Sequence, residues 1–211
     1  MLFRSVFSRK SGPGKSTLSC SMAAYLNNHW KKVCIVDADP QCSSKRWSER
    51  RAEGFIEEDA IKVFSMTGDI EGELEKLKKL DYDHIIVDCA GRDSVEMRSA
   101  LCIADLAIMV TLPSYLDREH YSYIADLLKD FKKENPRLKI KSVISLVTSE
   151  DANEVKKTRK DLKKHSLRPL GATIKAKVDY KKVMEHGLGG TESDISAVAN
   201  GMTSVIEEIL G

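Results

Sequence analysis

The stretch that decides the fold is LFRSVFSRKSGPGKSTLSCSMAAYLNNHW, residues 2–30. Its first six residues form a short apolar run typical of a buried strand, and residues 16–30 have the composition of a helix. Between them lies a turn that contains GPGKS, residues 12–16. A glycine-rich turn between a strand and a helix presents successive backbone N–H groups to a phosphate. The stretch therefore predicts a strand–loop–helix unit that binds phosphate.

The loop departs from the commonest phosphate-binding pattern, G-x-x-x-x-G-K-[ST]. Gly14, Lys15 and Ser16 match the second half of the pattern, but the first glycine would fall at the position of Arg9. Lys15 is expected to reach the β- and γ-phosphates, Ser16 to give its hydroxyl to Mg²⁺, and Thr17 to contact the α-phosphate. An ordinary glycine-rich turn without a ligand is the alternative.

The rest of the chain alternates short apolar runs with longer helical patterns. Further strands are predicted at 32–39, 61–64, 84–90, 105–112, 140–148 and 170–174, and helices at 41–54, 69–80, 117–134, 151–165, 179–186 and 194–210. Such alternation is typical of a parallel sheet that is covered on both faces. We therefore expect an α/β fold with three layers, a mostly parallel twisted sheet and helices on both faces, as a single domain over residues 1–211.

Acidic residues follow two of the predicted strands, where the carboxyl ends of the sheet should form the ligand site. Asp88 ends the apolar run HIIVD, and a carboxylate there is costly unless something pairs with it, such as a Mg²⁺ ion held through water. A helix cap or turn is the alternative role. In DADPQ, residues 37–41, either Asp37 or Asp39 could orient a water molecule near the γ-phosphate, although Asp37 could equally just end the strand.

Composition limits the other classes of function. The five Cys form no C-x-x-C pair and the five His are dispersed, which favours reduced thiols and gives no metal-ligand spacing. The sequence has no apolar run of 18 residues and no signal-peptide pattern, so we expect a cytoplasmic protein with no membrane partner.

Positive charge is concentrated in one segment. Residues 156–182 contain eleven Lys or Arg and two acids, a net charge of +9 in a chain whose total is +2. Such a segment can bind DNA nonspecifically through phosphates, whereas a solvated helix face that balances an acidic remainder is the alternative. The segment shows no aromatic interleaving that would indicate base-specific reading. The candidate DNA-binding residues are Lys156, Lys157, Arg159, Lys160, Lys163, Lys164 and Arg168.

Three motifs, RKSGPGKST (9–17), VDADPQCSSKRWSERR (36–51) and DYDHIIVDCAG (81–91), together resemble the ParA-type partition ATPases, in the deviant Walker-A (ParA/MinD) group of P-loop proteins. The family loop K-G-G-x-G-K-[ST] aligns with residues 10–16, and VTLPSYLD (110–117) and residues 172–194 also look like family segments. The chain is most similar to the small plasmid-encoded members. The resemblance implies a P-loop ATPase domain with ATP or ADP and Mg²⁺ as cofactors.

The resemblance also implies roles for single residues. Lys10 matches the signature lysine that reaches the nucleotide of the partner subunit in an ATP-sandwich homodimer, and Lys15 matches the ordinary phosphate-binding lysine. Asp39 matches the residue tied to hydrolysis, and Asp88 matches the Walker-B acid. The implied catalytic residues are Lys10, Lys15 and Asp39, and the implied metal-site residues are Ser16, Asp39 and Asp88. The implied nucleotide-binding residues are Ser11, Gly12, Pro13, Gly14, Lys15, Ser16 and Thr17.

The family also predicts partners and a place in the cell. ATP binding would drive dimerisation, and hydrolysis, slow until a centromere-binding adaptor protein stimulates it, would reverse it. The protein would bind nonspecific DNA on the nucleoid and segregate plasmid or chromosomal DNA. A ParA-like ATPase that positions a protein cargo or a division site is the alternative.

Some features depart from the family or favour other classes. Ser11 replaces the first glycine of the family loop, which would cost about 1 kcal/mol or more if that position needs a positive φ. A membrane-associated regulator like MinD needs a basic amphipathic C-terminal helix, but residues 197–211 are acidic. An electron-transfer ATPase like the nitrogenase iron protein would need cysteines such as Cys89 and Cys102 as cluster ligands.

Overall fold

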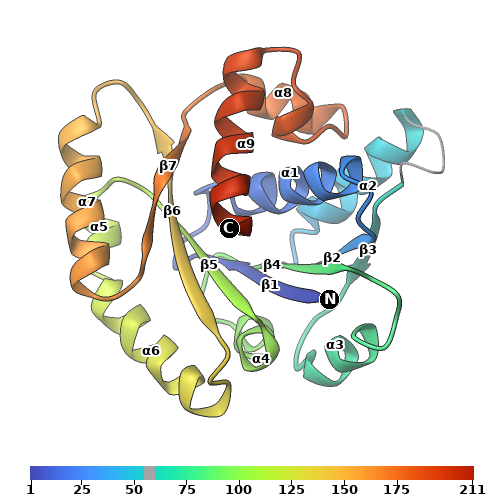
Figure 1. Cartoon of the computed structure of the whole chain (residues 1–211), viewed down its shortest axis with the longest axis horizontal. Helices are drawn as coiled ribbons and strands as arrows, with labels where there is room; N and C mark the ends of the chain where they lie inside the picture. Colours follow the sequence, from blue (N-terminus) through green and yellow to red (C-terminus); the bar gives the residue numbers. More distant parts are fainter. Residues whose placement is uncertain (55–59) are drawn as a thin grey trace.

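The structure is a computed structural model that describes residues 1–54 and 60–211. Its centre is a sheet with the strand order β3-β2-β4-β1-β5-β6-β7, in which every pairing is parallel (Figure 1). The strands are β1 (Leu2–Phe7), β2 (Val33–Ala38), β3 (Lys62–Ser65), β4 (His84–Cys89), β5 (Leu106–Thr111), β6 (Lys139–Val147) and β7 (Pro169–Lys175). The chain reverses its direction of winding at β1, which lies between β4 and β5.

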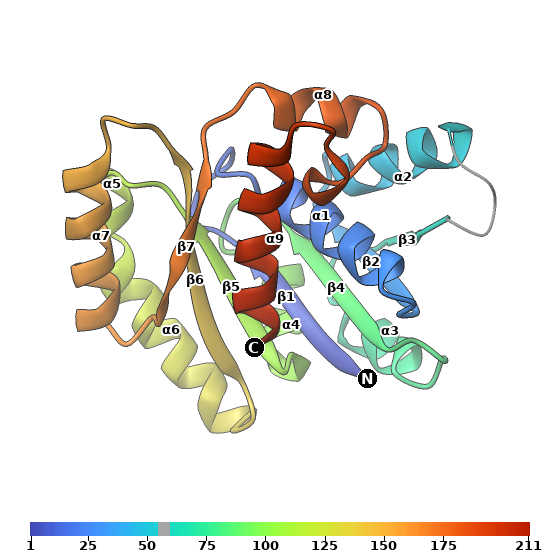
Figure 2. The same ribbon diagram turned by 45° about the horizontal axis from the view of Figure 1, so that its top comes forward.

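Helices cover both faces of this sheet (Figures 1 and 2). One face packs against α1 (Lys15–Asn28), α2 (Ser43–Gly54), α8 (Asp179–Glu185), the 3-10 turn η2 (Gly190–Glu192) and α9 (Ser196–Leu210). The other face packs against α3 (Glu71–Leu77), α4 (Val95–Ile103), α6 (Tyr121–Glu134) and α7 (Ala152–Lys164), with the short α5 (Tyr115–Arg118) beside α7. Each face has its own hydrophobic core.

Burial explains why two of the central strands, β2 and β5, are continuous apolar runs. All six residues of β2 (VCIVDA) and of β5 (LAIMVT) are buried, because a parallel sheet with helices on both faces leaves neither face to water. The predicted three-layer α/β fold is therefore confirmed, and the sheet is parallel throughout rather than mostly parallel.

Two helical segments differ from the prediction. The helix α4 was not predicted, although Ser94 is its N-cap and accepts a hydrogen bond from Met97 N at 3.2 Å. The single helix predicted at 117–134 is two helices, α5 and α6. The break falls at Glu119 and His120, which cap the end of α5 and the start of α6. The Asp117 carboxylate accepts hydrogen bonds from Ser114 Oγ at 2.5 Å and from Thr111 Oγ1 at 3.4 Å, so α5 is held beside the end of β5.

The described cysteines are free thiols. Burial raises the pKa of Cys34 and of Cys89 to about 12, so both thiols stay protonated at neutral pH. Cys89 lies in a hydrophobic core, and this packing argues against a cluster ligand at that position. Across residues 1–54 and 60–211, no helix combines the length and apolarity needed to cross a bilayer.

Candidate nucleotide-binding site

Three sequence segments meet at the carboxyl ends of the central strands, as expected. The loop after β1, the segment after β2 and the segment after β4 together enclose a cavity of about 200 Å³. Its lining includes Ser11, Asp39 and Gly91. The register of the sheet explains the meeting, because Asp88 pairs with Val6 on β1 and with Asp37 on β2, so the three strands end at the same level.

The loop has the backbone that its glycines permit. Gly12 and Gly14 have φ values of 94° and 92°, in the left-handed region that glycine adopts without a steric penalty. Gly14 is the N-cap of α1, and its carbonyl accepts a hydrogen bond from Leu18 N at 3.0 Å. Ser11 lies outside the left-handed region, so the penalty considered for a serine at this position does not arise.

Gly91 is a part of the site to which the sequence reasoning gave no role. A Cβ atom at this position would lie 2.6 Å from both Cα and N of Ser11 and 2.7 Å from the carbonyl carbon of Lys10. The end of β4 therefore packs directly against the loop backbone. The only sequence signal was a glycine three residues after Asp88 in DCAG.

Lys15 and Asp88 lie deep in the site. The Lys15 side chain, in the first turn of α1, belongs to a residue that is only 6% exposed, and Asp88 is fully buried. Asp88 accepts hydrogen bonds from Ser44 Oγ at 2.7 Å and from Ser19 Oγ at 3.3 Å. Burial raises the pKa of Asp88 to about 6, while hydrogen bonds from Ser16 and Ser44 oppose this rise. A buried carboxylate next to hydroxyl groups and a lysine fits a site for a hydrated cation and a phosphate.

The two acids after β2 have different surroundings. Asp37 is buried and accepts hydrogen bonds from Asp39 N at 3.2 Å and from Lys45 N at 2.9 Å, so its carboxylate holds the start of α2. Burial raises the pKa of Asp37, and these backbone hydrogen bonds oppose the rise. Asp39 is half-buried, accepts a hydrogen bond from Gln41 N at 2.9 Å, and lines the same cavity as Ser11. Asp39, and not Asp37, therefore lines the cavity beside the loop.

A larger cavity of about 460 Å³ lies on the other side of the loop. The loop side is formed by Gly12, Gly14, Ser16 and Thr17, and the opposite side carries four cations. These cations are Arg46, Arg50, Lys177 and Lys181. The sequence reasoning missed the two arginines and grouped both lysines with the basic segment. A concave, positively charged space next to a phosphate loop suits the parts of a nucleotide that the loop itself does not hold.

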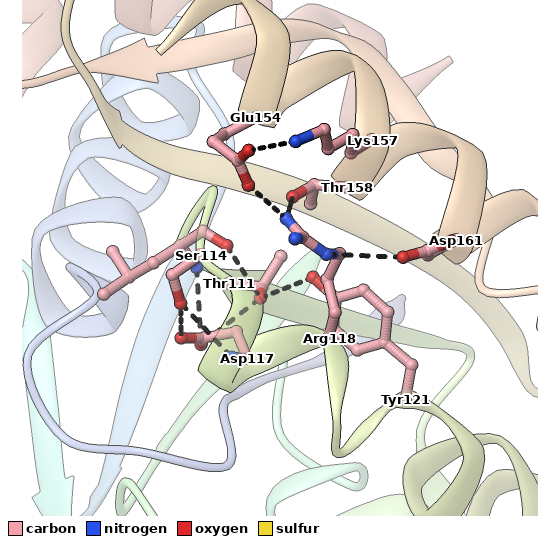
Figure 3. Close-up of polar contacts among 10 residues, drawn as sticks. Thr111, Ser114, Asp117, Arg118, Tyr121, Glu154, Lys157, Thr158 and Asp161 are labelled. Carbon is pink, nitrogen blue, oxygen red and sulfur yellow. Dashed lines mark hydrogen bonds and ion pairs between the residues drawn. The ribbon is translucent and has the colours of Figure 1, made fainter.

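Lys10 is held by its own chain. Its Nζ donates a hydrogen bond to Leu116 O at 3.1 Å and lies 3.8 Å from Asp117 Oδ2, and its side chain is 37% exposed. Asp117 is in turn fixed by Ser114 Oγ and by Thr111 Oγ1, which lies 3.4 Å from it (Figure 3). The family-like segment VTLPSYLD therefore contacts the lysine that precedes the loop.

The next residue, Arg118, connects this segment to α7. Its Nη1 donates to Glu154 Oε2 at 2.6 Å, and its Nε lies 3.3 Å from Asp161 Oδ2 (Figure 3). The Arg118 side chain is only 12% exposed, so the ion pairs are partly shielded from water. Two consecutive residues thus connect Lys10 with α7: Asp117 lies next to Lys10, and Arg118 forms ion pairs with acids on α7.

The predicted DNA-binding residues do not all lie on one surface. A shallow hollow of about 330 Å³ on α7 is lined by Lys156, Arg159, Lys160 and Lys163. Arg159 Nη2 also donates to Gly171 O at 2.8 Å. Lys164 is exposed nearby, whereas Lys157 forms an ion pair with Glu154 at 2.7 Å. Arg168 lies beyond the helix and lines a different cavity.

Comparison with known proteins places this geometry in a family. A family model described as the CobQ/CobB/MinD/ParA nucleotide binding domain matches residues 5–189. The "maintenance of carboxysome distribution protein A" of Halothiobacillus neapolitanus is 31% identical over 139 residues, which is 64% of this chain and 62% of that protein. The matched segments span only 50% to 62% of the lengths of the first three curated relatives.

Solved structures show the same fold at low identity. A complex of Cyanothece McdA(D38A) with ATP has a TM-score of 0.79 at 14% identity, covering 99% of this chain and 96% of that one. A Borrelia burgdorferi protein described as a plasmid partition protein, bound to AMPPNP, has a TM-score of 0.71 at 19% identity, covering 99% and 100%. A cobyrinic acid a,c-diamide synthase from Mycobacterium smegmatis, with an ATP analogue and magnesium, has a TM-score of 0.77 at 17% identity, covering 100% and 94%.

These likenesses support the fold, and the expected cofactors, ATP or ADP and Mg²⁺, agree with what these solved relatives hold. The family itself rests on the match over residues 5–189, which includes the loop, Asp39 and Asp88. The chain belongs to the CobQ/CobB/MinD/ParA nucleotide-binding domain family.

Proposed function

We propose that this protein is a ParA-type ATPase that binds and slowly hydrolyses ATP, dimerises around it and binds DNA nonspecifically. The observation that carries the proposal is the pair of lysines at the loop. Lys15 is buried in the first turn of α1, whereas Lys10 lies at the outer side of the loop with a side chain that is 37% exposed. A buried lysine suits the nucleotide of its own subunit, and an exposed one suits the nucleotide of a second copy.

The residues of the site divide the work of nucleotide binding. The N–H groups of residues 11–17 and the Nζ of Lys15 would hold the phosphates, and Pro13, which lacks an N–H, stiffens the turn. Ser16, Asp39 and Asp88 would hold Mg²⁺, with Asp88 acting through water because its oxygens already accept hydrogen bonds from serines. Mg²⁺ would neutralise charge on the phosphates during hydrolysis. Asp39 would orient the attacking water.

Lys10 would act between subunits. In the described chain, Lys10 contacts a carbonyl and lies near a carboxylate, Leu116 O and Asp117 Oδ2. These are contacts of moderate strength at a partly exposed position, so a phosphate of the partner subunit's nucleotide can replace them. Lys10, Lys15 and Asp39 would be the catalytic residues of a homodimer that forms with ATP and separates after hydrolysis.

The exposed face of α7 is the candidate DNA surface. Lys156, Lys160, Lys163 and Lys164 are exposed on it, and none of these four forms an ion pair with a described acid. Phosphate contacts from such lysines give salt-dependent binding without sequence preference. We infer that the dimer binds the nucleoid through two such faces and that a centromere-binding adaptor protein stimulates hydrolysis and links the ATPase to plasmid or chromosomal DNA.

A second function of the same class is the positioning of a protein cargo. The observation that favours it is the relative from Halothiobacillus neapolitanus, whose name assigns it to carboxysome distribution. Both functions use the same ATPase and differ in what the adaptor carries. A plasmid-loss assay in cells without the gene distinguishes them, because faster plasmid loss supports partition and unchanged retention favours a protein cargo.

The test of the proposed function is retention of the protein on nonspecific DNA with ATP, with ADP or without nucleotide, over a series of salt concentrations. We expect retention with ATP that weakens steeply with salt. The double variant Lys156→Gln/Lys160→Gln should lower the slope of the salt dependence by about 2 per subunit, because two phosphate contacts are lost. The matched control is Lys129→Gln/Lys133→Gln on α6, where both lysines pair with nearby aspartates. Equal retention with ATP and ADP would contradict the proposal.

A further inference from the structure

A second large cavity lies at the opposite edge of the sheet from the phosphate loop. It measures about 890 Å³ and is formed by the amino ends of β1, β5 and β6, the segment after α6 and the last residues of α9. Figure 2 shows both ends of the chain at this edge. Six cations line the cavity: Arg4, Lys132, Arg137, Lys139, Lys141 and Arg168. Its one acidic lining residue, Asp105, accepts a hydrogen bond from Phe3 N at 2.8 Å.

The positive charge of this cavity is poorly compensated. Within residues 1–54 and 60–211, none of the six cations forms an ion pair with an aspartate or glutamate. Elsewhere in the described chain, ten such contacts are present. A concave surface lined by one sign of charge focuses the electrostatic field and raises the local concentration of counter-ions. The cavity is therefore suited to an anionic ligand.

Arg4 is the most informative of the six residues. It lies on the central strand β1, is 4% exposed, and its Nε is buried without a hydrogen-bond partner. Its Nη1 lies 2.6 Å from Nδ1 of His84. Burial, followed by the nearby guanidinium, lowers the pKa of His84 to about 4, so this imidazole is neutral and accepts the hydrogen bond without balancing the charge. Burial likewise lowers the pKa of Arg4 to about 10, and the nearby Asp105 carboxylate opposes this fall. Asp105 therefore offsets part of the cost of burying this cation, and an anion in the cavity would offset more of it.

The other cations come from different elements and surround the same space. Lys141 Nζ donates to Glu208 O at 2.6 Å and to Ile209 O at 3.0 Å, which fixes the ammonium group beneath the last turn of α9. Arg137 and Lys139 are exposed and lie at the start of β6, one before and one after the buried Leu138. Cations at several depths fit a ligand with several negative groups better than a single carboxylate.

We propose that this cavity is a second anion-binding site that takes a ligand bearing a chain of phosphate groups. Arginine forks match phosphate oxygens in bidentate geometry, and lysines act as point charges beside them. A volume of about 890 Å³ is large enough for a nucleotide-sized ligand. Both an inorganic polyphosphate and a nucleotide carry such a chain of phosphate groups, so either could be the ligand. The inference goes beyond the ATPase function and does not depend on it, because the cavity lies at the other edge of the sheet.

Calorimetric titration with inorganic tripolyphosphate tests the site. The titration uses the full chain carrying Lys15→Gln, so that the phosphate loop contributes little, and circular dichroism checks that each variant is folded. We expect one binding event per chain. Arg137→Gln/Lys139→Gln should weaken it at least about tenfold, because hydrogen bonds to charged groups are lost at exposed positions that the fold does not need. The matched control, Lys129→Gln/Lys133→Gln, removes the same charge from α6 and should leave the affinity unchanged within about twofold.

Three outcomes would overturn the site: no binding to the Lys15→Gln chain, equal weakening by the cavity and control variants, or undiminished binding to the cavity variant. A parallel titration with a non-hydrolysable nucleoside triphosphate distinguishes the source of the phosphate chain. Tighter binding of the nucleotide than of tripolyphosphate supports a nucleotide ligand, and equal or weaker binding supports an inorganic chain. Failure of this site would leave nucleotide binding by the unsubstituted loop intact, so the two proposals fail separately.

Discussion

Replacing Gly91 by alanine tests whether the end of β4 sets the geometry of the phosphate loop. The new Cβ would lie 2.6 Å from Cα and N of Ser11 and 2.7 Å from the carbonyl carbon of Lys10. Ordinary contacts between carbon atoms are about 3.5 to 4.0 Å, so the loop backbone must move by about 1 Å. The atoms that must move belong to the backbone, which cannot avoid the contact by changing rotamer as a flexible side chain can.

The expected cost follows from overpacking. Extra atoms in a well-packed site cost about 1 to 3 kcal/mol. If the loop gives way, this cost appears as a loss of nucleotide affinity of about 5-fold to 150-fold. Because Gly91 does not have a left-handed φ, alanine adds no backbone strain, and the effect is purely steric.

The assay is a titration with a fluorescent ATP analogue, combined with urea unfolding. Gly72→Ala is the matched control, because Gly72 lies in α3 and a Cβ there has no atom within 4 Å. This control should bind nucleotide normally and be stabilised by up to about 1 kcal/mol through its helix propensity. If Gly91→Ala binds nucleotide within twofold of the wild type and its stability is unchanged, the end of β4 does not set the geometry of the loop.

The remaining predictions concern two ion-pair networks. Glu192→Ala should lower the free energy of unfolding at pH 7 by about 3 to 5 kcal/mol, since it removes the carboxylate that contacts Arg51 at 2.7 Å, where Arg51 is 1% exposed. Burial raises the pKa of Glu192, but hydrogen bonds from Arg51 and Gly189 outweigh it and hold the pKa below its ordinary value. The stabilisation by Glu192 is therefore fully present above the ordinary glutamate pKa of about 4.3 and is lost as the pH falls through the lower pKa of the folded state. In urea unfolding, the difference in free energy between wild type and variant should shrink on acidification. A difference that stays constant with pH would contradict this. Arg118→Ala should lower the free energy of unfolding by about 1 to 2 kcal/mol, because Glu154 and Asp161 lose a shielded partner. The control Lys129→Ala removes an ion pair whose side chains are about two-thirds exposed, and thermal unfolding should show a change in this free energy of less than about 0.5 kcal/mol. Equal shifts for the two would argue against the junction between α5 and α7.

Much of the fold was predictable because its strands are short apolar runs of one kind. The runs ending in Asp37 and Asp88 are buried on both faces, and their order along the chain with intervening helices predicts a parallel sheet. The helix α4 was missed although Met97, Ala100 and Leu101 have helical spacing, because the helix has only nine residues and follows shortly after the strand-end motif DCAG. The break between α5 and α6 falls at Glu119 and His120, where neither a glycine, a proline nor a side-chain cap marks it in the sequence.

The site was predictable only where a residue type has a fixed chemical task. The loop glycines and Lys15 have such tasks, and the structure gives Gly12 and Gly14 the positive φ values that they permit. Gly91 and Ser44 were missed because their importance comes from what they approach in space, the loop backbone and the Asp88 carboxylate. The concern about Ser11 also depended on a backbone angle that the sequence does not specify.

We propose that the loop forms a nucleotide site that a second copy completes through Lys10. Sedimentation with ATP and Mg²⁺, and with ADP, tests this in the wild type, Lys10→Ala and Lys15→Ala, with nucleotide affinity measured alongside. We expect dimers of the wild type with ATP only, nucleotide-bound monomers of Lys10→Ala, and nucleotide-free monomers of Lys15→Ala. Normal ATP-dependent dimers of Lys10→Ala, or unchanged nucleotide affinity of Lys15→Ala, would contradict the proposal.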